Sequence, residues 1–370
     1  MLLNNVLGVI ATITAGAHAA RIPSGHPKPN HSNVSVGSST AVTTSSSSTS
    51  TSVSTIYDFP ANTYAENLAV RCNGQILIDL LTAPQLWLVD PSTPGQAVLV
   101  HEFANANALG GIVEIDTDVF AVVVGNVTLA TGNGVDGSWS IWSIDLAGRD
   151  ITSNETISEN PPQVAKIADI PTASLLNGLA FLEGDGSNHL LAGDIKLGTI
   201  VSVDIDSGDY VTAVNNNYTA PSYIYGLGNS GTDGVQVRDD VLYWSNIGQG
   251  ILYRVPLDTT TGLPNGAYEK VATRATSLDQ WDDFTFDSHG NVYIVAGGAN
   301  TVEKIDIETR EVSLVAGDLN STTLAEPSSA KFGRRSADGD VLYVTTAGGL
   351  LAPVNGDITV GGQVVAIKTN

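Results

Sequence analysis

The stretch that decides the fold is NGLAFLEGDGSNHLLAGDIKLGTIVSVDIDSG, which runs from Asn177 to Gly208. It contains three apolar segments separated by turns rich in Gly, Asp and Asn, and the last segment ends in Val-Asp. This pattern predicts antiparallel β-strands joined by short turns. The middle segment, HLLAG, is apolar on both faces, as expected for a strand packed between two neighbouring sheets.

The same pattern occurs six times. The other copies begin at Glu66, Gly110, Asp233, Asp282 and Ser328. The intervals are roughly 45 to 65 residues, which is long enough for four strands each. We therefore predict an all-β fold, a six-bladed β-propeller with four-stranded antiparallel blades over residues 55–370. A sandwich of two sheets would not require six copies of one phrase.

Closing the ring requires the two ends of the domain to hide their sheet edges. We expect the early Ile56–Phe59 segment or the terminal Gln363–Lys368 strand to do this by pairing with the opposite end.

The composition excludes several classes of partner. The chain has 38 Asp and Glu but only 16 Lys and Arg, and its formal net charge is −22. Binding to phosphate backbones or anionic membrane surfaces depends on Lys and Arg, and the sequence has no basic stripe. We therefore predict no nucleic-acid partner. An acidic surface is compatible with solubility or with cation binding.

The amino terminus resembles a secretory signal. Residues 1–20 combine a short apolar run with the small-residue site Ala17-His18-Ala19, and residues 21–54 are rich in Ser, Thr and Pro. We interpret these as a signal peptide and a disordered leader, with a buried helix or membrane anchor as the alternative. The chain is expected in the secretory pathway, in a vesicle or outside the cell, without membrane insertion after signal removal. Six sequons are predicted to be glycosylated: Asn30, Asn33, Asn126, Asn154, Asn217 and Asn320.

Nucleophilic catalysis finds little support in the sequence. Cys72 is the only cysteine, and we expect an inert, buried thiol. No Ser/His/Asp set is visible, because His101, His189 and His289 fall in strand or turn positions away from the predicted mouth of the propeller.

Polar groups are expected to converge at that mouth, where the loops entering each innermost strand and following each second strand meet. The candidates are Glu66, Asn177, Asp194, Lys196, Asp233, Asn246, Asp282 and Asp283, with Trp281 beside them. The connections Tyr218–Tyr225 and Thr128–Ser138 are candidates for loops that cover the mouth.

Three phrases resemble a known family. Glu66-Asn67, Asn177-Gly178-Leu179-Ala180 and Asp233-Gly234-Val235 look like the metal-ligand phrases of the senescence-marker/gluconolactonase family of six-bladed propellers. The resemblance implies that Glu66, Asn177 and Asp233 hold a divalent ion, usually calcium, and that Asp233 is the base in lactone hydrolysis. One further Asn of that family is replaced here by the apolar stretch Ala108–Ile112.

The chain more specifically resembles a fungal branch with phrases of the ENLAV, SIWSIDL, LNGL, DDFTFD and LYVTTAGG kind. That branch includes hetero-Diels-Alderases of meroterpenoid biosynthesis, which close a dihydropyran ring between a quinone methide and an alkene. The resemblance implies a small hydrophobic substrate.

Three hypotheses about function follow. The first is a hetero-Diels-Alderase without a cofactor, in which Lys196, Asn177 or Asn246 donates a hydrogen bond and Trp281, Trp244 and Tyr225 form walls. The second is a lactone hydrolase that uses Asp233 and a calcium or other divalent ion. The third is a secreted binding propeller without chemistry. The candidate catalytic residues are Lys196, Asn177, Asp233 and Trp281.

Overall fold

The structure is a computed structural model. It describes residues 51–128, 131–149, 151, 161–184, 186, 188–224, 228–277 and 279–369. The predicted signal peptide, most of the leader, Tyr225 and the sequons at Asn30, Asn33 and Asn154 lie outside these residues. Within the described ranges, no helix has the length and apolar character needed to cross a membrane.

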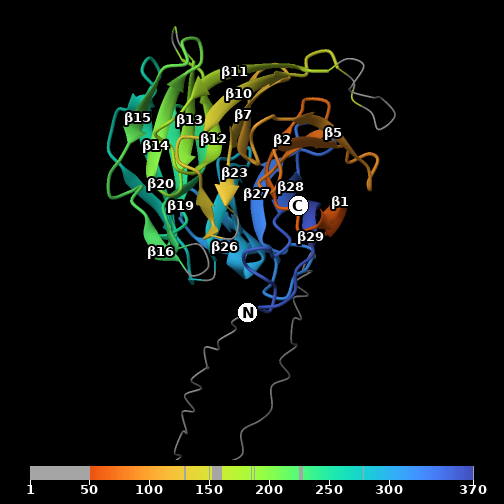
Figure 1. The fold of residues 1–370 in the computed structure, drawn as a ribbon. Helices are drawn as coiled ribbons and strands as arrows, with labels where there is room; N and C mark the ends of the chain where they lie inside the picture. The colour runs from red at the N-terminus through yellow and green to blue at the C-terminus, as the bar shows by residue number, and fades with distance from the viewer. Residues whose placement is uncertain are drawn as a thin grey trace, which may run out of the picture. The chain divides into compact units, whose positions relative to one another are not determined.

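Six antiparallel sheets form the blades of a propeller, as predicted (Figure 1). The first three blades are β2 (Ala65–Val70), β3 (Ile76–Leu80), β4 (Gln85–Val89) and β5 (Ala97–Glu102); β6 (Ala108–Asp116), β7 (Val119–Gly125), β10 (Ser140–Asp145) and β11 (Gln163–Asp169); and β12 (Leu176–Leu182), β13 (His189–Asp194), β14 (Thr199–Asp204) and β15 (Tyr210–Val214). The innermost strands β2, β6 and β12 contact one another in this order.

The other three blades complete the ring. They are β18 (Thr232–Arg238), β19 (Val241–Asn246), β20 (Ile251–Asp258) and β22 (Glu269–Thr273), with β21 (Leu263–Pro264) paired to the end of β20; β23 (Trp281–Phe286), β24 (Val292–Ala296), β25 (Thr301–Ile305) and β26 (Val312–Gly317); and β27 (Pro327–Phe332), β28 (Val341–Thr346), β29 (Gly361–Lys368) and β1 (Val53–Ala61). Contacts of β12 with β18, β18 with β23, β23 with β27 and β27 with β2 close the circle of inner strands.

The first and last strands of the domain pair with each other to complete the sixth blade. Val53 lies opposite Ile367 and Ala61 opposite Gly361 in the antiparallel register of β1 and β29. Both segments expected to close the ring therefore take part. The strand begins two residues before Thr55, where we predicted the domain to start. The pairing covers the open edge of β29 and makes β1 the outer strand of the blade.

The core is divided among the six interfaces between neighbouring blades, each with its own apolar cluster. The second strand of every blade contributes to these clusters on both of its faces, and β3, β13 and β24 are buried along their whole length. This explains why the sequence shows continuous apolar runs there rather than alternation. Each fully buried Leu, Ile or Val contributes about 1.5 to 3 kcal/mol.

Two short hairpins lie outside the blades. They are β8 (Val127–Thr128) with β9 (Asn133–Gly134), and β16 (Ser222–Ile224) with β17 (Gly228–Ser230). The first hairpin packs closely against the connection before β12, because a Cβ atom at Gly134 would lie only 1.9 Å from the Ser174 carbonyl oxygen.

Cys72 corrects one expectation from the sequence. It is exposed rather than buried, because it lies in the turn between β2 and β3.

Candidate functional site

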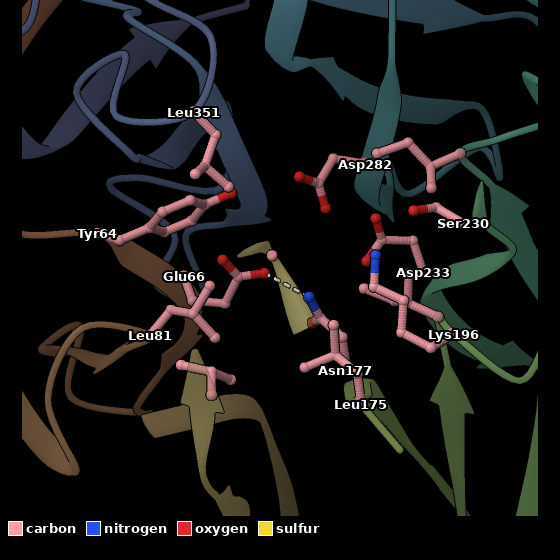
Figure 2. A pocket seen from close by; sticks show the side chains of 14 residues that line it. Tyr64, Glu66, Leu81, Leu175, Asn177, Lys196, Ser230, Asp233, Asp282 and Leu351 are labelled. Atoms are coloured by element: carbon pink, nitrogen blue, oxygen red, sulfur yellow. Dashed lines mark hydrogen bonds between the residues drawn. The ribbon is translucent and has the colours of Figure 1, made fainter. Parts of the chain in front are cut away.

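A cavity opens at the end of the channel where the innermost strands begin (Figure 2). Its empty volume, counting the open space at its mouth, is about 590 Å³. Polar residues and large apolar residues both contribute to its wall. The lining residues are Tyr64, Glu66, Leu81, Val127, Gly132, Leu175, Asn177, Ile195, Lys196, Ser230, Asp233, Ile247, Asp282 and Leu351.

The polar floor comes from one position of the repeat. Glu66, Asn177, Asp233 and Asp282 are the second residues of β2, β12, β18 and β23. Because the innermost strands run in the same direction around one axis, equivalent positions face a common space. Figure 2 shows these four side chains converging from different blades.

Three carboxyl groups on this floor have oxygen atoms without a hydrogen-bond partner in the described structure. They are Glu66 Oε2, Asp233 Oδ1 and Asp282 Oδ1, on residues that are only 1%, 3% and 8% exposed. Burial, and then the other carboxyl groups, raises the pKa of Glu66 and Asp282 well above the usual range. Burial and the nearby Asp283 raise the pKa of Asp233 to about 8. Carboxyl groups packed together in this way favour the protonated form.

Asn177 binds Glu66 with its nitrogen, and this bears on the predicted calcium site. Its Nδ2 donates to Glu66 Oε1 at 2.7 Å, while its Oδ1 accepts the N–H of Gly178 at 2.6 Å and Nδ2 of Asn67 at 3.2 Å. The amide oxygen is therefore engaged by two donors. Calcium requires six or more oxygen ligands.

The cavity floor also offers too few other ligands for the ion that the resemblance implies. Blade two contributes Leu109 at the equivalent position, and no group of three Asp, Glu, His or Cys side chains in the described ranges has an arrangement suited to a metal ion. The residues as arranged do not fit a calcium site formed by Glu66, Asn177 and Asp233. The predicted divalent ion stays a prediction.

Lys196 and Tyr64 complete the polar part of the cavity. Lys196 is half-buried in the loop after β13, and burial lowers the pKa of its ammonium group while the nearby Asp233 opposes this shift. Tyr64 is buried two residues before Glu66, and burial together with the neighbouring carboxyl groups raises the pKa of its phenol well above the usual value. Both groups are hydrogen-bond donors facing the carboxyl cluster.

Trp281 does not line the cavity, although it precedes Asp282. It is fully buried in the apolar cluster between blades four and five, and its Nε1 donates to Glu303 Oε2 at 2.7 Å. Successive side chains on a strand point to opposite sides, so Trp281 and Asp282 cannot share the floor. Trp244 is likewise a core residue, whose Nε1 donates to the carbonyl oxygen of Tyr218 at 3.1 Å.

Asp194, Asn246 and Asp283 support the site without lining it. Asp194 accepts hydrogen bonds from the amides of Ser174, Leu175, Lys196 and Leu197. Its carboxylate thereby fixes both loops that carry cavity residues.

Asn246 holds the connection before β16, because its Nδ2 donates to the carbonyl oxygens of Tyr218 and Ala220. Of the two predicted covering loops, the 128–138 insert supplies Gly132 to the wall. None of the described residues 218–224 of the other predicted covering connection lines the cavity, whereas Ser230 at the end of β17 does. Of the sequons within the described residues, Asn217 and Asn320 are exposed and Asn126 is half-buried.

The apolar wall residues were not predicted, although the sequence carried a signal for them. Leu81, Ile195, Ile247 and Leu351 lie in loops that follow the second strand of a blade, the loop class expected at the mouth. The prediction considered only polar and aromatic residues in those loops. Tyr64 could have been found from its spacing, because residues two apart on a strand face the same side.

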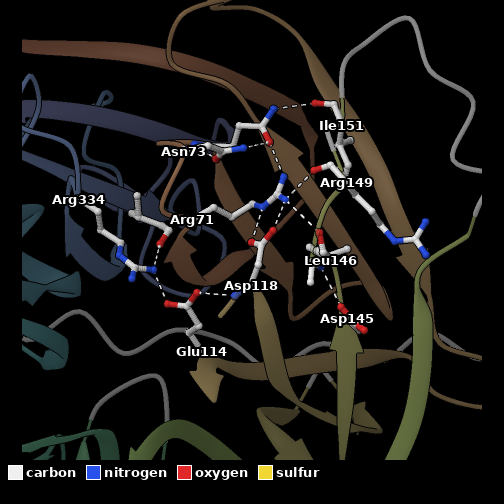
Figure 3. Close-up of polar contacts among 12 residues, drawn as sticks. Arg71, Asn73, Glu114, Asp118, Asp145, Leu146, Arg149, Ile151 and Arg334 are labelled. Carbon is white, nitrogen blue, oxygen red and sulfur yellow. Dashed lines mark hydrogen bonds and ion pairs between the residues drawn. The ribbon is translucent and has the colours of Figure 1, made fainter. Parts of the chain in front are cut away.

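The opposite end of the channel has a contrasting polar cluster around Arg71, just beyond the end of β2 (Figure 3). Arg71 is buried, and its guanidinium donates to Asp118 Oδ1 at 2.8 Å, to the Arg149 carbonyl oxygen at 2.9 Å and to Gln75 Oε1. This cluster joins the first two blades.

Comparisons with known proteins agree with the fold and with the resemblance seen in the sequence. No protein-family profile matches the chain. A protein from a Phoma species, provisionally named a hetero-Diels-Alderase, is 29% identical over 78% of this chain and 85% of its own length. A second protein with the same provisional name, from Sarocladium schorii, is 26% identical over 85% of this chain and 82% of its own.

The chain is therefore similar to two proteins that carry this provisional name. Its fold is also that of a luciferin-regenerating enzyme, with a TM-score of 0.59 and 16% identity over 86% of this chain and 95% of the other. A calcium-binding regucalcin from Agrobacterium tumefaciens superposes with a TM-score of 0.55 and 15% identity over 85% and 94% of the two chains. At this identity the two structures show the fold alone. The two sequence relatives agree with the predicted resemblance to hetero-Diels-Alderases.

Proposed function

We propose that this protein is a hetero-Diels-Alderase that joins a quinone-methide-like heterodiene to an alkene in the cavity. In this [4+2] addition, one C–C and one C–O bond form from the π electrons of the two partners, and no atom leaves. The observation that carries the proposal is a buried floor of three carboxyl groups with unpartnered oxygens beneath an apolar wall. The similarity to the two fungal proteins supports it.

The apolar wall supplies proximity. Leu81, Leu175, Ile247 and Leu351 form surfaces against which a hydrocarbon partner can pack, and they keep water away from the reacting atoms. Holding both reactants in a reactive pose contributes up to about 7 to 11 kcal/mol to rate acceleration. The substrate class expected from this wall is small and hydrophobic.

The polar floor supplies the electrophilic activation. A hydrogen bond to the heterodiene carbonyl oxygen lowers the energy of the charge that develops there, and one such donor contributes about 3 to 4 kcal/mol. A carboxyl group kept protonated by burial can donate this bond, as can Lys196 Nζ. We assign the donor role to Asp282 or Glu66, with Lys196 as a further donor. Asn177 orients Glu66 through its hydrogen bond. Asp233 lies beside Lys196 in the cavity wall (Figure 2).

The proposal is tested by generating an ortho-quinone methide in solution with an alkene and analysing the dihydropyran on a chiral column. The protein is expected to accelerate its formation and to give an excess of one stereoisomer, with or without chelator. Product at the uncatalysed rate and without stereochemical excess would contradict the proposal. Calcium-dependent hydrolysis of a lactone panel would replace it with the gluconolactonase hypothesis.

A further inference from the structure

Glu326 combines burial with an unusual backbone conformation. It directly precedes β27, is 6% exposed, and has a φ of 52°. This is the left-handed region, which residues other than Gly, Asn and Asp rarely adopt. Such a conformation persists only where surrounding contacts hold it, and it often marks a functional position.

The backbone of Glu326 is fixed from two blades. Its N–H donates to Asn300 Oδ1 at 2.8 Å, and its carbonyl oxygen accepts the N–H of Ala347 at 2.7 Å. Asn300 ends the short 3₁₀ turn Gly297–Ala299 of blade five. Ala347 directly follows β28 in blade six. These bonds leave the carboxylate of Glu326 pointing at the loop between β28 and β29.

That carboxylate holds a segment of the cavity wall. Its Oε2 accepts the N–H of Leu351 at 2.9 Å, and the amides of Leu350 and Ala352 also donate to it. Three successive amides directed at one carboxylate form a compact anion-binding arrangement. The Leu351 side chain lines the cavity, on the same side as Tyr64 in Figure 2.

We propose that Glu326 is a positioning residue that holds residues 350–352 in place, so that Leu351 completes the apolar wall of the ligand cavity. Glu326 acts through Leu351 and does not line the cavity itself. The proposal rests on the cavity being the ligand site of the proposed function, but not on the reaction that takes place there.

The test measures the binding of N-phenyl-1-naphthylamine, a neutral apolar fluorescent probe, to four proteins. These are the wild type, E326Q, L351A and the double variant. E326Q and L351A are each expected to weaken binding about tenfold, and the double variant no more than L351A alone, because two changes acting through one contact are not additive. E303Q is the matched control, since Glu303 accepts the N–H of the buried Trp281 and does not line the cavity, and its probe affinity should equal that of the wild type.

Two results would overturn the inference: probe affinity unchanged in E326Q, or effects of E326Q and L351A that add. If E326Q does not fold, E326D is measured with the same expectations, because it keeps the charge but shortens the reach to the 350–352 amides. The expected pattern in a protein that forms no dihydropyran would support the positioning role while contradicting the proposed function.

Discussion

The two ends of the propeller channel both bury charged groups but treat them differently. Around Arg71, donors and acceptors are matched, since the guanidinium bonds Asp118, Gln75 and two backbone carbonyls. At the cavity, Glu66 and Asp282 each retain an oxygen without a partner among the described residues. One strand, β2, connects the two environments.

The contrast separates a structural role from a functional one. A buried charge that is fully paired stabilises its surroundings only as long as both partners remain. A buried oxygen left unpaired costs stability, and proteins keep such a cost where a ligand is bound. We infer that the Arg71 end holds blades together, whereas the carboxyl end is reserved for a ligand.

The largest effect on stability is expected from disrupting the Arg71 cluster. Arg71→Met leaves Asp118 buried without its cation and should lower the free energy of unfolding by about 3 to 5 kcal/mol in urea titrations. The control is Arg254→Met, whose solvent-exposed pair with Glu269 should contribute little to stability. Equal losses in the two variants would show that the Arg71 cluster has no special structural role.

Substitution in the carboxyl floor of the cavity should have the opposite effect on stability. Asp282→Ala is expected to slow dihydropyran formation about 100-fold, while its melting temperature stays the same or rises because an unpartnered buried oxygen is removed.

Its neighbour Asp283 provides the matched comparison. Asp283 accepts bonds from Ser329 Oγ and the Phe284 amide, both at 2.7 Å. Asp283→Ala should therefore lower the free energy of unfolding by roughly 2 kcal/mol. If Asp282→Ala proves the more destabilising variant, the functional assignment of that end fails.

The fold could be predicted from the sequence because each blade repeats one local pattern. Apolar segments such as the one ending at Asp194 identified the buried second strands, and their sixfold recurrence gave the number of blades. The exact closure could not be predicted, since the pairing of Val53 with Ile367 depends on contacts more than 300 residues apart in the chain.

The site could be predicted in part. Glu66, Asn177, Asp233 and Asp282 line the cavity because repeat position encodes which way a strand residue faces, and Lys196 lines it from the loop after β13. Trp281 was predicted beside the mouth but lies in the core, since neighbouring residues on a strand point to opposite sides. The apolar wall was not predicted, because only polar and aromatic residues were expected in the loops that follow the second strands.

Stability should decrease with rising pH. Burial raises the pKa of Asp79 and Glu326 to about 7, and that of Asp233 to about 8. Between about pH 4 and 8 the folded protein therefore holds protons that the unfolded chain releases, so the free energy of unfolding falls as pH rises over this interval. Urea titrations should show a loss of several kcal/mol from pH 5 to pH 8, because each pKa unit between pH 5 and the pKa of the folded state contributes about 1.4 kcal/mol. Stability that increases over this interval would argue against protonated carboxyl groups.

The smallest expected effect is that of calcium. Because Asn177 turns its nitrogen toward Glu66, millimolar calcium or a chelator should shift the melting temperature by less than about 1 °C. A specifically bound ion at a free concentration of 100 times its Kd would instead raise the free energy of unfolding by about 2.7 kcal/mol. A clear stabilisation that Asp233→Asn abolishes would restore the metal-site hypothesis.

The most direct measurement is a crystal structure of the protein with a stable dihydropyran product. We expect a ring or carbonyl oxygen of the product within about 3.2 Å of a carboxyl oxygen of Glu66, Asp233 or Asp282, and its hydrocarbon part against Leu351. A product bound elsewhere, or bound in the cavity with all three carboxyl groups still unpartnered, would contradict the account.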